Sequence, residues 1–370
     1  MKKKFDEVFV DKTKYGTKIK TDEYHKNGKH LIIDQGQTDV AGYTDLEEGL
    51  FTEVPVVIFG DHTRVIKYVD KPFFLGADGT KVLRSKIADA NYKYLYYALK
   101  SVKLPNTGYN RHFKWLKEVE IQYPEISKQK EIADILDRIN RIINARKTEL
   151  HKLDDLIKAR FVEMFGSIHD GRYDMKTLPE IVNDDKNSIK RGPFGGALKK
   201  DDFVEDGYLV YEQRHAIHND FEYAKYYITQ EKYEDMIGFK VIPGDLIISC
   251  SGVTLGRIAE GPEGAKEGII NQALLKLSLN PEVMLNTFFI QQFRGEEIQE
   301  ILFGFSRGSG IPNMPSMSEV KAVKFICPPL ELQKQYCDFV NQVDKSKVVV
   351  QKALEKTQLL FDSLMQQYFG

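Results

Sequence analysis

Two distant stretches of this chain are copies of one another. Residues 123–166 align with residues 327–370 without a gap, at a constant offset of 204 positions. Identical pairs include Pro124 and Pro328, Gln129 and Gln333, Leu150 and Leu354, Leu156 and Leu360, and Phe165 and Phe369. An internal repeat limits the possible folds strongly, because both copies are expected to adopt one structure. It divides the chain into the segments 1–122, 123–166, 167–326 and 327–370.

Apolar residues recur within each copy at alternating steps of four and three. This period of about 3.5 residues is typical of a coiled-coil seam. No Pro or Gly interrupts either run, so we predict that each copy forms one long helix of roughly 50 Å. Gly166 and Gly370 would close the helices as left-handed caps. The predicted seam consists of Ile132, Leu136, Ile139, Ile143, Leu150, Leu153 and Ile157 in the first copy and Val340, Val343, Val350, Leu354, Phe361 and Leu364 in the second.

Neither helix can bury its apolar stripe alone, and this favours pairing of the two helices. Burial contributes about 25 cal/mol per Å² of apolar surface, which makes two exposed stripes of this length costly. One such stripe would fit any long amphipathic helix, but two ungapped copies favour a structural repeat. The charged seam positions are offset between the copies: Arg146 and Arg160 match Val350 and Leu364, and Lys347 matches Ile143.

The segments 1–122 and 167–326 share one order of predicted elements. Short β-branched runs bounded by turn residues predict strands, and apolar residues at helical spacing predict a helix after them. In the first segment the strands are 30–34, 54–60 and 64–70, and the helix is 92–100. In the second the strands are 207–212, 240–249 and 273–279, the helix is 287–302, and a glycine-rich loop spans 303–315. We therefore predict an α+β fold with two strand-rich globular domains, two long helices and a pseudo-twofold internal repeat.

The charge of the chain is distributed unevenly. The net charge is −1, which argues against binding of nucleic acid by bulk electrostatics alone. Residues 1–122 carry 21 Lys and Arg against 17 Asp and Glu, whereas residues 167–326 carry 18 against 24. Any contact of the second domain with DNA must therefore use a local basic face or be shared with partners.

Composition and the chain start indicate a protein of the cytoplasm. The first residues, MKKKFDEVFV, lack an apolar signal core, and the longest apolar run, VPVVIF, is far too short to cross a bilayer. We therefore expect no membrane partner. Cys250, Cys327 and Cys337 have no metal-ligand spacing and are expected to be reduced, ordinary residues.

Known catalytic and metal-binding patterns are missing from the sequence. It contains no Walker A pattern, no H-E-x-x-H, no zinc pattern, no nucleophile elbow and no Asn-Pro-Pro-aromatic motif. Glycine clusters at 192–197 and 307–310 resemble nucleotide-binding loops only loosely and are expected to be turns. We therefore predict no catalytic residues and no metal site.

Basic and amide side chains gather on the predicted loops of both globular domains. Arg pairs well with guanine, and Asn or Gln with adenine, so these loops carry suitable donors for base edges. A solvated loop side chain is the alternative for each residue taken alone. In the first domain the candidates are Gln35, Gln37, His62, Thr63, Arg64, Lys81, Arg84, Asn110, Arg111 and His112. In the second they are Lys190, Arg191, Lys199, Lys200, Arg214, His215, Ser251, Thr254, Arg257, Asn271, Gln272, Ser306 and Arg307.

The arrangement resembles the specificity subunit of type I restriction-modification systems over essentially the full length. The similarity is carried by VVIFGDHTRVIKYVDKPFFLGADG at 56–79, PEISKQKEIADILDRI at 124–139, FVEMFG at 161–166, VIPGDLIISCSGVTLGRIA at 241–259 and PPLELQKQ at 328–335. In that family two target-recognition domains alternate with two long helices, which form an antiparallel coiled coil that spaces the domains.

The resemblance implies a reader of DNA without catalytic activity of its own. Each domain would read one half of a split, asymmetric target in double-stranded DNA, and the helices would fix the gap, with half-sites about 34–36 Å apart. The partners would be two modification subunits, which carry AdoMet, and restriction subunits, which use ATP and Mg, so this chain would bind no cofactor. Two alternatives stay open: a coiled-coil adaptor whose globular domains bind proteins, and a self-sufficient enzyme.

Overall fold

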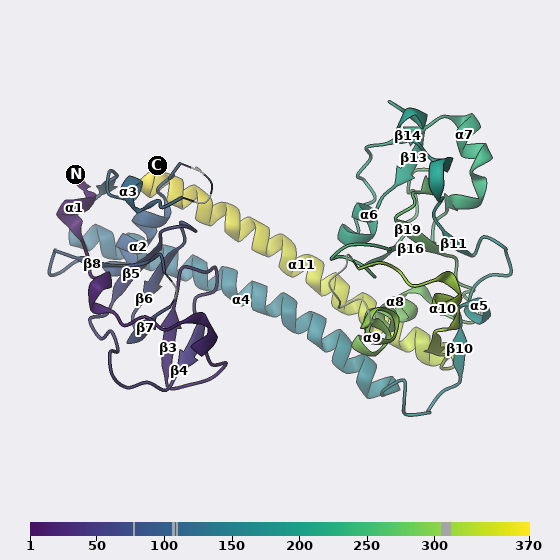
Figure 1. The fold of residues 1–370 in the computed structure, drawn as a ribbon, viewed down its shortest axis with the longest axis horizontal. Helices are drawn as coiled ribbons and strands as arrows, with labels where there is room; N and C mark the ends of the chain where they lie inside the picture. Colours follow the sequence, from purple (N-terminus) through teal and green to yellow (C-terminus); the bar gives the residue numbers. More distant parts are fainter. Residues whose placement is uncertain (77, 106–107, 109, 305–311) are drawn as a thin grey trace. The chain divides into compact units, whose positions relative to one another are not determined.

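The computed structural model describes residues 1–76, 78–105, 108, 110–304 and 312–370. It consists of two compact units (Figure 1). The first comprises Met1–Glu149 and Val350–Gly370, and the second comprises Leu150–Val349. Both boundaries fall inside long helices, α4 (Ile126–Phe165) and α11 (Leu330–Phe369), so each unit contains a globular part and a portion of both helices.

The globular part of the first unit is built on two sheets. One has the strand order β2-β8-β5-β6, the other has the order β4-β3-β7, and β1 pairs with β9. The elements are β1 (Lys2–Lys4), α1 (Phe5–Val8), β2 (Phe9–Asp11), β3 (His30–Ile33), β4 (Gly42–Thr44), β5 (Val56–Gly60), β6 (Ile66–Val69), β7 (Phe73–Leu75), β8 (Thr80–Ser85), α2 (Tyr92–Lys100), α3 (Phe113–Leu116) and β9 (Glu120–Gln122), with 3-10 turns at Thr13–Tyr15 and Thr21–Glu23.

Strand β5 is the centre of this unit because both of its faces are buried. Val57 and Phe59 pack in a core that also contains α2 and the first part of α4, whereas Val56 and Ile58 pack on the opposite face. A continuous apolar run is what a strand covered on both sides requires. Asn91 caps α2 by accepting a hydrogen bond from the backbone N–H of Tyr94 at 3.0 Å.

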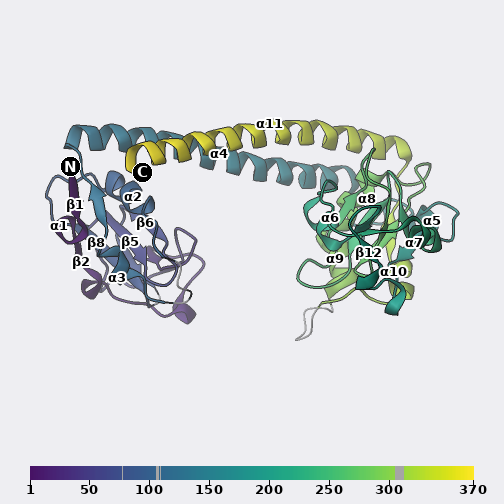
Figure 2. The ribbon, with the colours of Figure 1, turned by 90° about the horizontal axis from the view of Figure 1, so that it is seen from above.

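The globular part of the second unit, drawn in teal and green in Figure 2, repeats this plan with longer connections between its strands. Its sheets have the orders β11-β19-β16-β17 and β12-β14-β13-β18-β15, and β10 pairs with β20. The elements are β10 (Met175–Thr177), α5 (Leu178–Ile181), β11 (Ile189–Arg191), β12 (Phe203–Val204), β13 (Tyr208–Tyr211), α6 (Gln213–His218), β14 (Tyr227–Ile228), α7 (Gln230–Asp235), β15 (Lys240–Val241), β16 (Leu246–Ser249), β17 (Ile258–Glu260), β18 (Gly268–Ile270), β19 (Leu274–Leu277), α8 (Asn286–Arg294), α9 (Glu296–Phe303), α10 (Met317–Ala322) and β20 (Lys324–Ile326), with 3-10 turns at Gly195–Ala197, Lys200–Asp202 and Ile237–Phe239.

The internal repeat extends from the helices into the globular parts. In both units a central strand, β5 or β16, lies between two antiparallel neighbours. In both units one pair is parallel, β3 with β7 and β13 with β18. The predicted mixed α and β architecture with an internal repeat is thus confirmed.

Two predicted elements of the second unit are each divided in the structure. The segment 240–249 forms β15 and β16, separated by a turn in which Gly244 has a φ of 84°. The Asp245 carboxylate accepts a hydrogen bond from the backbone N–H of Ile242 at 2.9 Å and closes this turn. The segment 287–302 forms α8 and α9, because Gly295 between them is extended, with φ −62° and ψ 144°. Glycine is the weakest helix former apart from proline, which explains the break.

Helices α4 and α11 pair in an antiparallel manner within each unit. In the first unit Arg146 of α4 donates to the carbonyl of Ala353 and the hydroxyl of Thr357. In the second unit the ammonium of Lys347 lies 2.7 Å from the carboxylate of Asp154. Residues with lower numbers in α4 therefore contact residues with higher numbers in α11. The charged seam positions fix the register of the helix pair.

The residues of the predicted seam are buried or partly buried in both units. Ile132, Leu136, Ile139, Ile143, Ile157, Val340, Val343 and Phe361 are buried, and Leu150, Leu153, Val350, Leu354 and Leu364 are partly buried. Gly166 has a φ of 71°, as expected of a left-handed cap.

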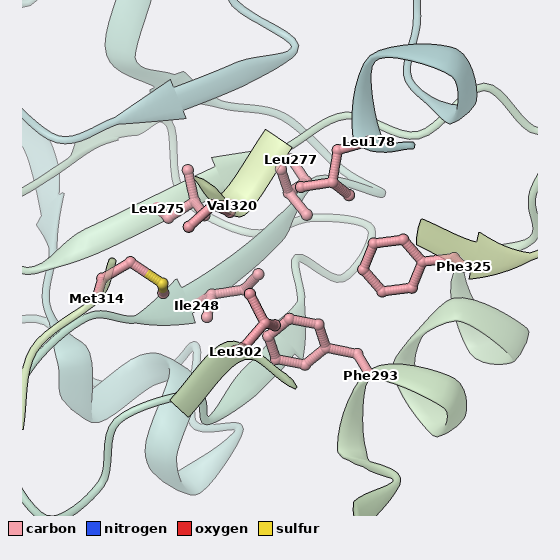
Figure 3. A pocket seen from close by; sticks show the side chains of 9 residues that line it. All are labelled: Leu178, Ile248, Leu275, Leu277, Phe293, Leu302, Met314, Val320 and Phe325. Carbon is pink, nitrogen blue, oxygen red and sulfur yellow. The ribbon is translucent and has the colours of Figure 1, made fainter. Parts of the chain in front are cut away.

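The main core of the second unit is apolar. A void of about 10 Å³ lies among the side chains of Leu178, Ile248, Leu275, Leu277, Phe293, Leu302, Met314, Val320 and Phe325 (Figure 3). The void is about the size of one water, but its lining offers no polar partner, so it is a packing feature and not a ligand site.

Within the described part of the chain, no helix is long and apolar enough to cross a membrane. Among the same residues, no group of three or more His, Cys, Asp or Glu side chains could hold a metal. Burial raises the pKa of Cys250 to about 12 and that of Cys337 to about 11, so both thiols are protonated at neutral pH.

Candidate nucleic-acid interface

Several strand ends of the first unit meet at one edge of its sheets. The antiparallel pairs place the end of β5 beside the starts of β6 and β8, since Phe59 faces Ile66 and Gly60 faces Thr80. The parallel strands β3 and β7 also end together, because Ile33 is in register with Leu75. This edge, which we call the first reading edge, carries Gln35, Gln37, His62, Thr63 and Arg64 on its loops and Lys81 near the start of β8.

Gln35 connects the three loops of the first reading edge. Its side-chain carbonyl accepts a hydrogen bond from the backbone N–H of His62 at 3.1 Å, and its amide donates to the carbonyl of Asp78 at 2.6 Å. Its backbone carbonyl accepts a hydrogen bond from the Thr63 hydroxyl at 2.6 Å. Gln35 therefore positions the β5–β6 hairpin, where Arg64 has a left-handed φ of 61° that non-glycine residues adopt rarely.

A buried lysine that the sequence did not reveal holds the neighbouring loop. The ammonium of Lys67 donates to the carbonyls of Asp34 and Thr38, at 2.7 Å each, and lies 3.5 Å from the Asp34 carboxylate. Burial lowers the pKa of Lys67, and the Asp34 carboxylate opposes this effect. Lys67 thus holds the loop that exposes Gln37 at two points, one on either side of Gln37.

Three basic residues of the first domain that we predicted to lie on loops and contact DNA have different surroundings in the structure. Lys81 lies 3.8 Å from the Asp11 carboxylate. Arg84 lies near the end of β8, opposite Val10, and pairs with Glu53 at 3.6 Å, whereas the reading edge is at the start of β8. His112 is fully buried, and one ring nitrogen lies 3.0 Å from the carbonyl of Asp61. The expectation that His112 contacts a base is therefore wrong for this structure, whereas Asn110 and Arg111 beside it are exposed.

The second unit has an equivalent edge. Arg191 at the end of β11 faces Leu275 near the start of β19, and Ser249 at the end of β16 faces Leu274. The parallel strands β13 and β18 also end here, at Tyr211 and Ile270. This second reading edge carries Lys190, Arg191, Arg214, Ser251, Thr254, Arg257, Asn271 and Gln272.

Gln213 in the second unit corresponds to Gln35 in the first. Both are the second residue after a strand that pairs in parallel, and both contact the neighbouring hairpin. The amide of Gln213 donates to the hydroxyl of Ser251 at 3.0 Å. Sequence reasoning missed Gln213, although its spacing from the parallel strand could have revealed it.

The structure separates other predicted residues from the second reading edge. His215 is fully buried and accepts a hydrogen bond from the backbone N–H of Glu212 at 2.9 Å, while its other ring nitrogen lies 2.9 Å from the carbonyl of Tyr223. A direct contact of His215 with DNA is therefore wrong for this structure. Lys199 and Lys200 precede β12, which pairs with β14. Strand β14 in turn pairs with the start of β13, away from the edge where β13 ends. Ser306 and Arg307 lie outside the described residues.

The chain matches known proteins along most of its length. The family model described as the type I restriction modification DNA specificity domain matches residues 1–153 and 193–358. The specificity subunit of the Escherichia coli type I restriction enzyme EcoR124I/EcoR124II is 28% identical over 191 residues, which cover 46% of this chain and 44% of that relative. The aligned part thus spans less than half of that curated relative.

Solved structures show the same fold. The crystal structure of the S subunit of a type I restriction-modification system from M. genitalium has a TM-score of 0.57 and 20% identity, covering 100% of this chain and 96% of that one. A structure describing complex assembly and conformational transition of the type I R-M system has a TM-score of 0.55 and 13% identity, covering 100% and 97%. From the two matches of the family model, this chain belongs to the family of type I restriction-modification DNA specificity proteins.

Proposed function

We propose that this chain is the DNA-specificity subunit of a type I restriction-modification complex, and that each reading edge reads one half of a split target. The observation that carries the proposal is the repeated edge. The same strands end together in both units, and in both a glutamine connects the ends to a hairpin. Two similar but non-identical readers on one chain suit a target with two different halves.

The side chains of the edges match the chemistry of base edges. Guanidinium groups donate to guanine, and amides such as Asn271 and Gln272 match adenine. Arg257 is exposed and makes no ion pair with the described residues, so its charge is available to a base or a phosphate. Lys81 and Arg84 have carboxylate neighbours and suit support of their strands better than base readout.

The two helices supply the spacing in this proposal. Each helix has 40 residues, and the seam with its charged positions fixes how far one helix is displaced along the other. A coiled coil keeps its length because seam contacts resist sliding. The gap between the half-sites would therefore be set by the number of residues in the helices.

Exposed apolar side chains on the helices suit the binding of two modification subunits. The first unit exposes Ile142 of α4 and Leu359 and Leu360 of α11, and the second exposes Leu156 and Val162 of α4 and Val348 and Val349 of α11. Leu156 and Leu360 occupy equivalent positions of the repeat. Two similar surfaces can bind two copies of one partner. Methyl transfer with AdoMet would then belong to the modification subunits, and ATP- and Mg-dependent steps to restriction subunits, with no catalysis by this chain.

Competition binding with the purified complex tests the proposal. The chain is co-expressed with its modification subunits, and the complex is titrated with a pool of random duplexes at several salt concentrations. We expect enrichment of duplexes that share two short sequences at one fixed separation. Binding without any sequence preference at every salt concentration would refute the proposal and favour the protein-binding adaptor.

A further inference from the structure

The hairpin between β16 and β17 exposes a valine at its tip. The side chain of Val253 is 98% exposed, the largest value among the exposed apolar residues described. A single exposed apolar residue on a mobile loop would need no explanation. The surroundings of Val253 are different, because the loop that carries it is fixed on both sides.

Hydrogen bonds hold the two ends of this hairpin together. The backbone N–H of Ser249 donates to the carbonyl of Arg257 at 2.8 Å, and the N–H of Gly256 donates to the carbonyl of Ser249 at 2.9 Å. The hydroxyl of Ser249 donates to the carbonyl of Thr254 and accepts from the N–H of Arg257 at 2.9 Å. The loop therefore closes on its own backbone.

The flanks of the hairpin are held by other segments of the same unit. The N–H of Gly252 donates to the carbonyl of Pro312 at 2.8 Å, and the N–H of Met314 donates to the carbonyl of Cys250 at 2.8 Å. Gln213 binds Ser251 from the other side. Gly252 has a φ of 77°, a left-handed conformation that glycine adopts without a steric penalty. The valine is thus displayed by a braced turn.

The position of Val253 on the second reading edge indicates a role in recognition. Ser251, Thr254 and Arg257 flank it, so a polar group lies on either side of the apolar tip. The domain carries more acidic than basic residues, so its contact with DNA depends on local complementarity more than on overall charge. The matching hairpin of the first unit offers no apolar residue between Gly60 and Val65, only Asp61, His62, Thr63 and Arg64.

We propose that Val253 contacts the C5-methyl group of a thymine in the half-site that the second unit reads. This inference rests on the proposed function and adds the group that is read. Thymine is the base that offers an apolar group in the major groove. A β-branched side chain suits such a contact, because it has few rotamers and loses little freedom on binding.

Replacement of thymine by uracil tests the contact directly, because uracil lacks only the C5-methyl group. The complex with modification subunits is titrated with duplexes in which each thymine of the target is replaced in turn. At one thymine of the second half-site, the wild-type complex should lose about fourfold to tenfold in affinity. The complex with Val253→Ala should bind thymine and uracil equally at that position. Val253→Thr, which keeps the shape but replaces one methyl group with a hydroxyl, should discriminate less than the wild type.

Ile242→Ala is the matched control. Ile242 is 47% exposed and lies in the turn before β16, at the other end of that strand. This variant should keep the wild-type preference for thymine, and no thymine of the first half-site should respond to Val253→Ala.

Several outcomes would overturn the proposal while leaving the proposed function intact. They are a second half-site without thymine, no thymine in it that responds to uracil, or a response that persists in Val253→Ala. A wild-type complex without any sequence preference would refute the proposed function as well.

Discussion

Removing one heptad from both long helices should shorten the gap between the two half-sites. Deletion of 144–150 from α4 and 351–357 from α11 keeps the alternation of four and three on each helix, since Ile143 and Val350 then precede the next seam residues at the original spacing. The deletion also removes Arg146 together with its partners Ala353 and Thr357, so no buried charge is left unpaired.

The size of the effect follows from helix geometry. Seven residues shorten a helix by about 10.5 Å. One base pair rises about 3.4 Å along the duplex, so the gap should shrink by up to about 3 base pairs. A heptad rotates an α-helix by only about 20° relative to the seam, so the remaining seam residues should stay in contact.

The assay is the mapping of methylated adenines by single-molecule sequencing of DNA exposed to the variant complex. We expect the two half-site sequences to be unchanged and the gap to be shorter. The control is deletion of 144–150 alone, which leaves Thr357 without Arg146 and shifts the register, so it should abolish recognition. An unchanged gap in the double deletion, with both half-sites retained, would refute the role of the helices in spacing.

Three further predictions address single parts of the molecule. Leu136→Ala, at a fully buried seam position, should lower the free energy of unfolding by about 2–5 kcal/mol in chemical denaturation. Leu156→Ala, at an exposed position, should change this free energy by less than about 1 kcal/mol. Equal effects of the two variants would contradict the assignment of Leu136 to the buried seam. Lys67→Met should weaken selection of the first half-site about tenfold or more in competition binding. The reason is that the loop with Gln37 loses its three contacts with Lys67. An equal loss of selection at the second half-site would contradict a local effect. Exchange of residues 1–122 for the corresponding domain of another family member should change one half-site in methylation mapping, and a change in both would argue against independent readers.

The long helices could be predicted from the sequence because their signal is local and repeated. The period of 3.5 residues, the absence of Pro and Gly and the terminal Gly166 depend on neighbours along the chain. The strands β5, β6 and β13 were also predictable, as short apolar runs between turn residues. The breaks at Gly244 and Gly295, which divide two predicted elements, were less predictable, because one glycine within an apolar run gives only a weak signal.

The reading edges could be predicted only in part. Loop residues such as Thr63 and Arg257 were found by their chemistry, but their convergence depends on strand register between distant segments. The burial of His112 and His215 was not predictable for the same reason, and an arginine directly precedes each of them in the sequence. Lys67 was missed because a lysine within a strand is usually exposed, whereas here backbone carbonyls of another loop compensate its burial.

The central claim, that one chain reads two half-sites and fixes their separation, is tested most directly by mapping DNA methylation. This chain is co-expressed with its modification subunit in a host without other adenine methylation, and modified adenines are located by single-molecule sequencing. The account predicts one split motif, with two different half-sites and one fixed gap. Methylation at a single continuous motif, or at half-sites with a variable gap, would contradict it.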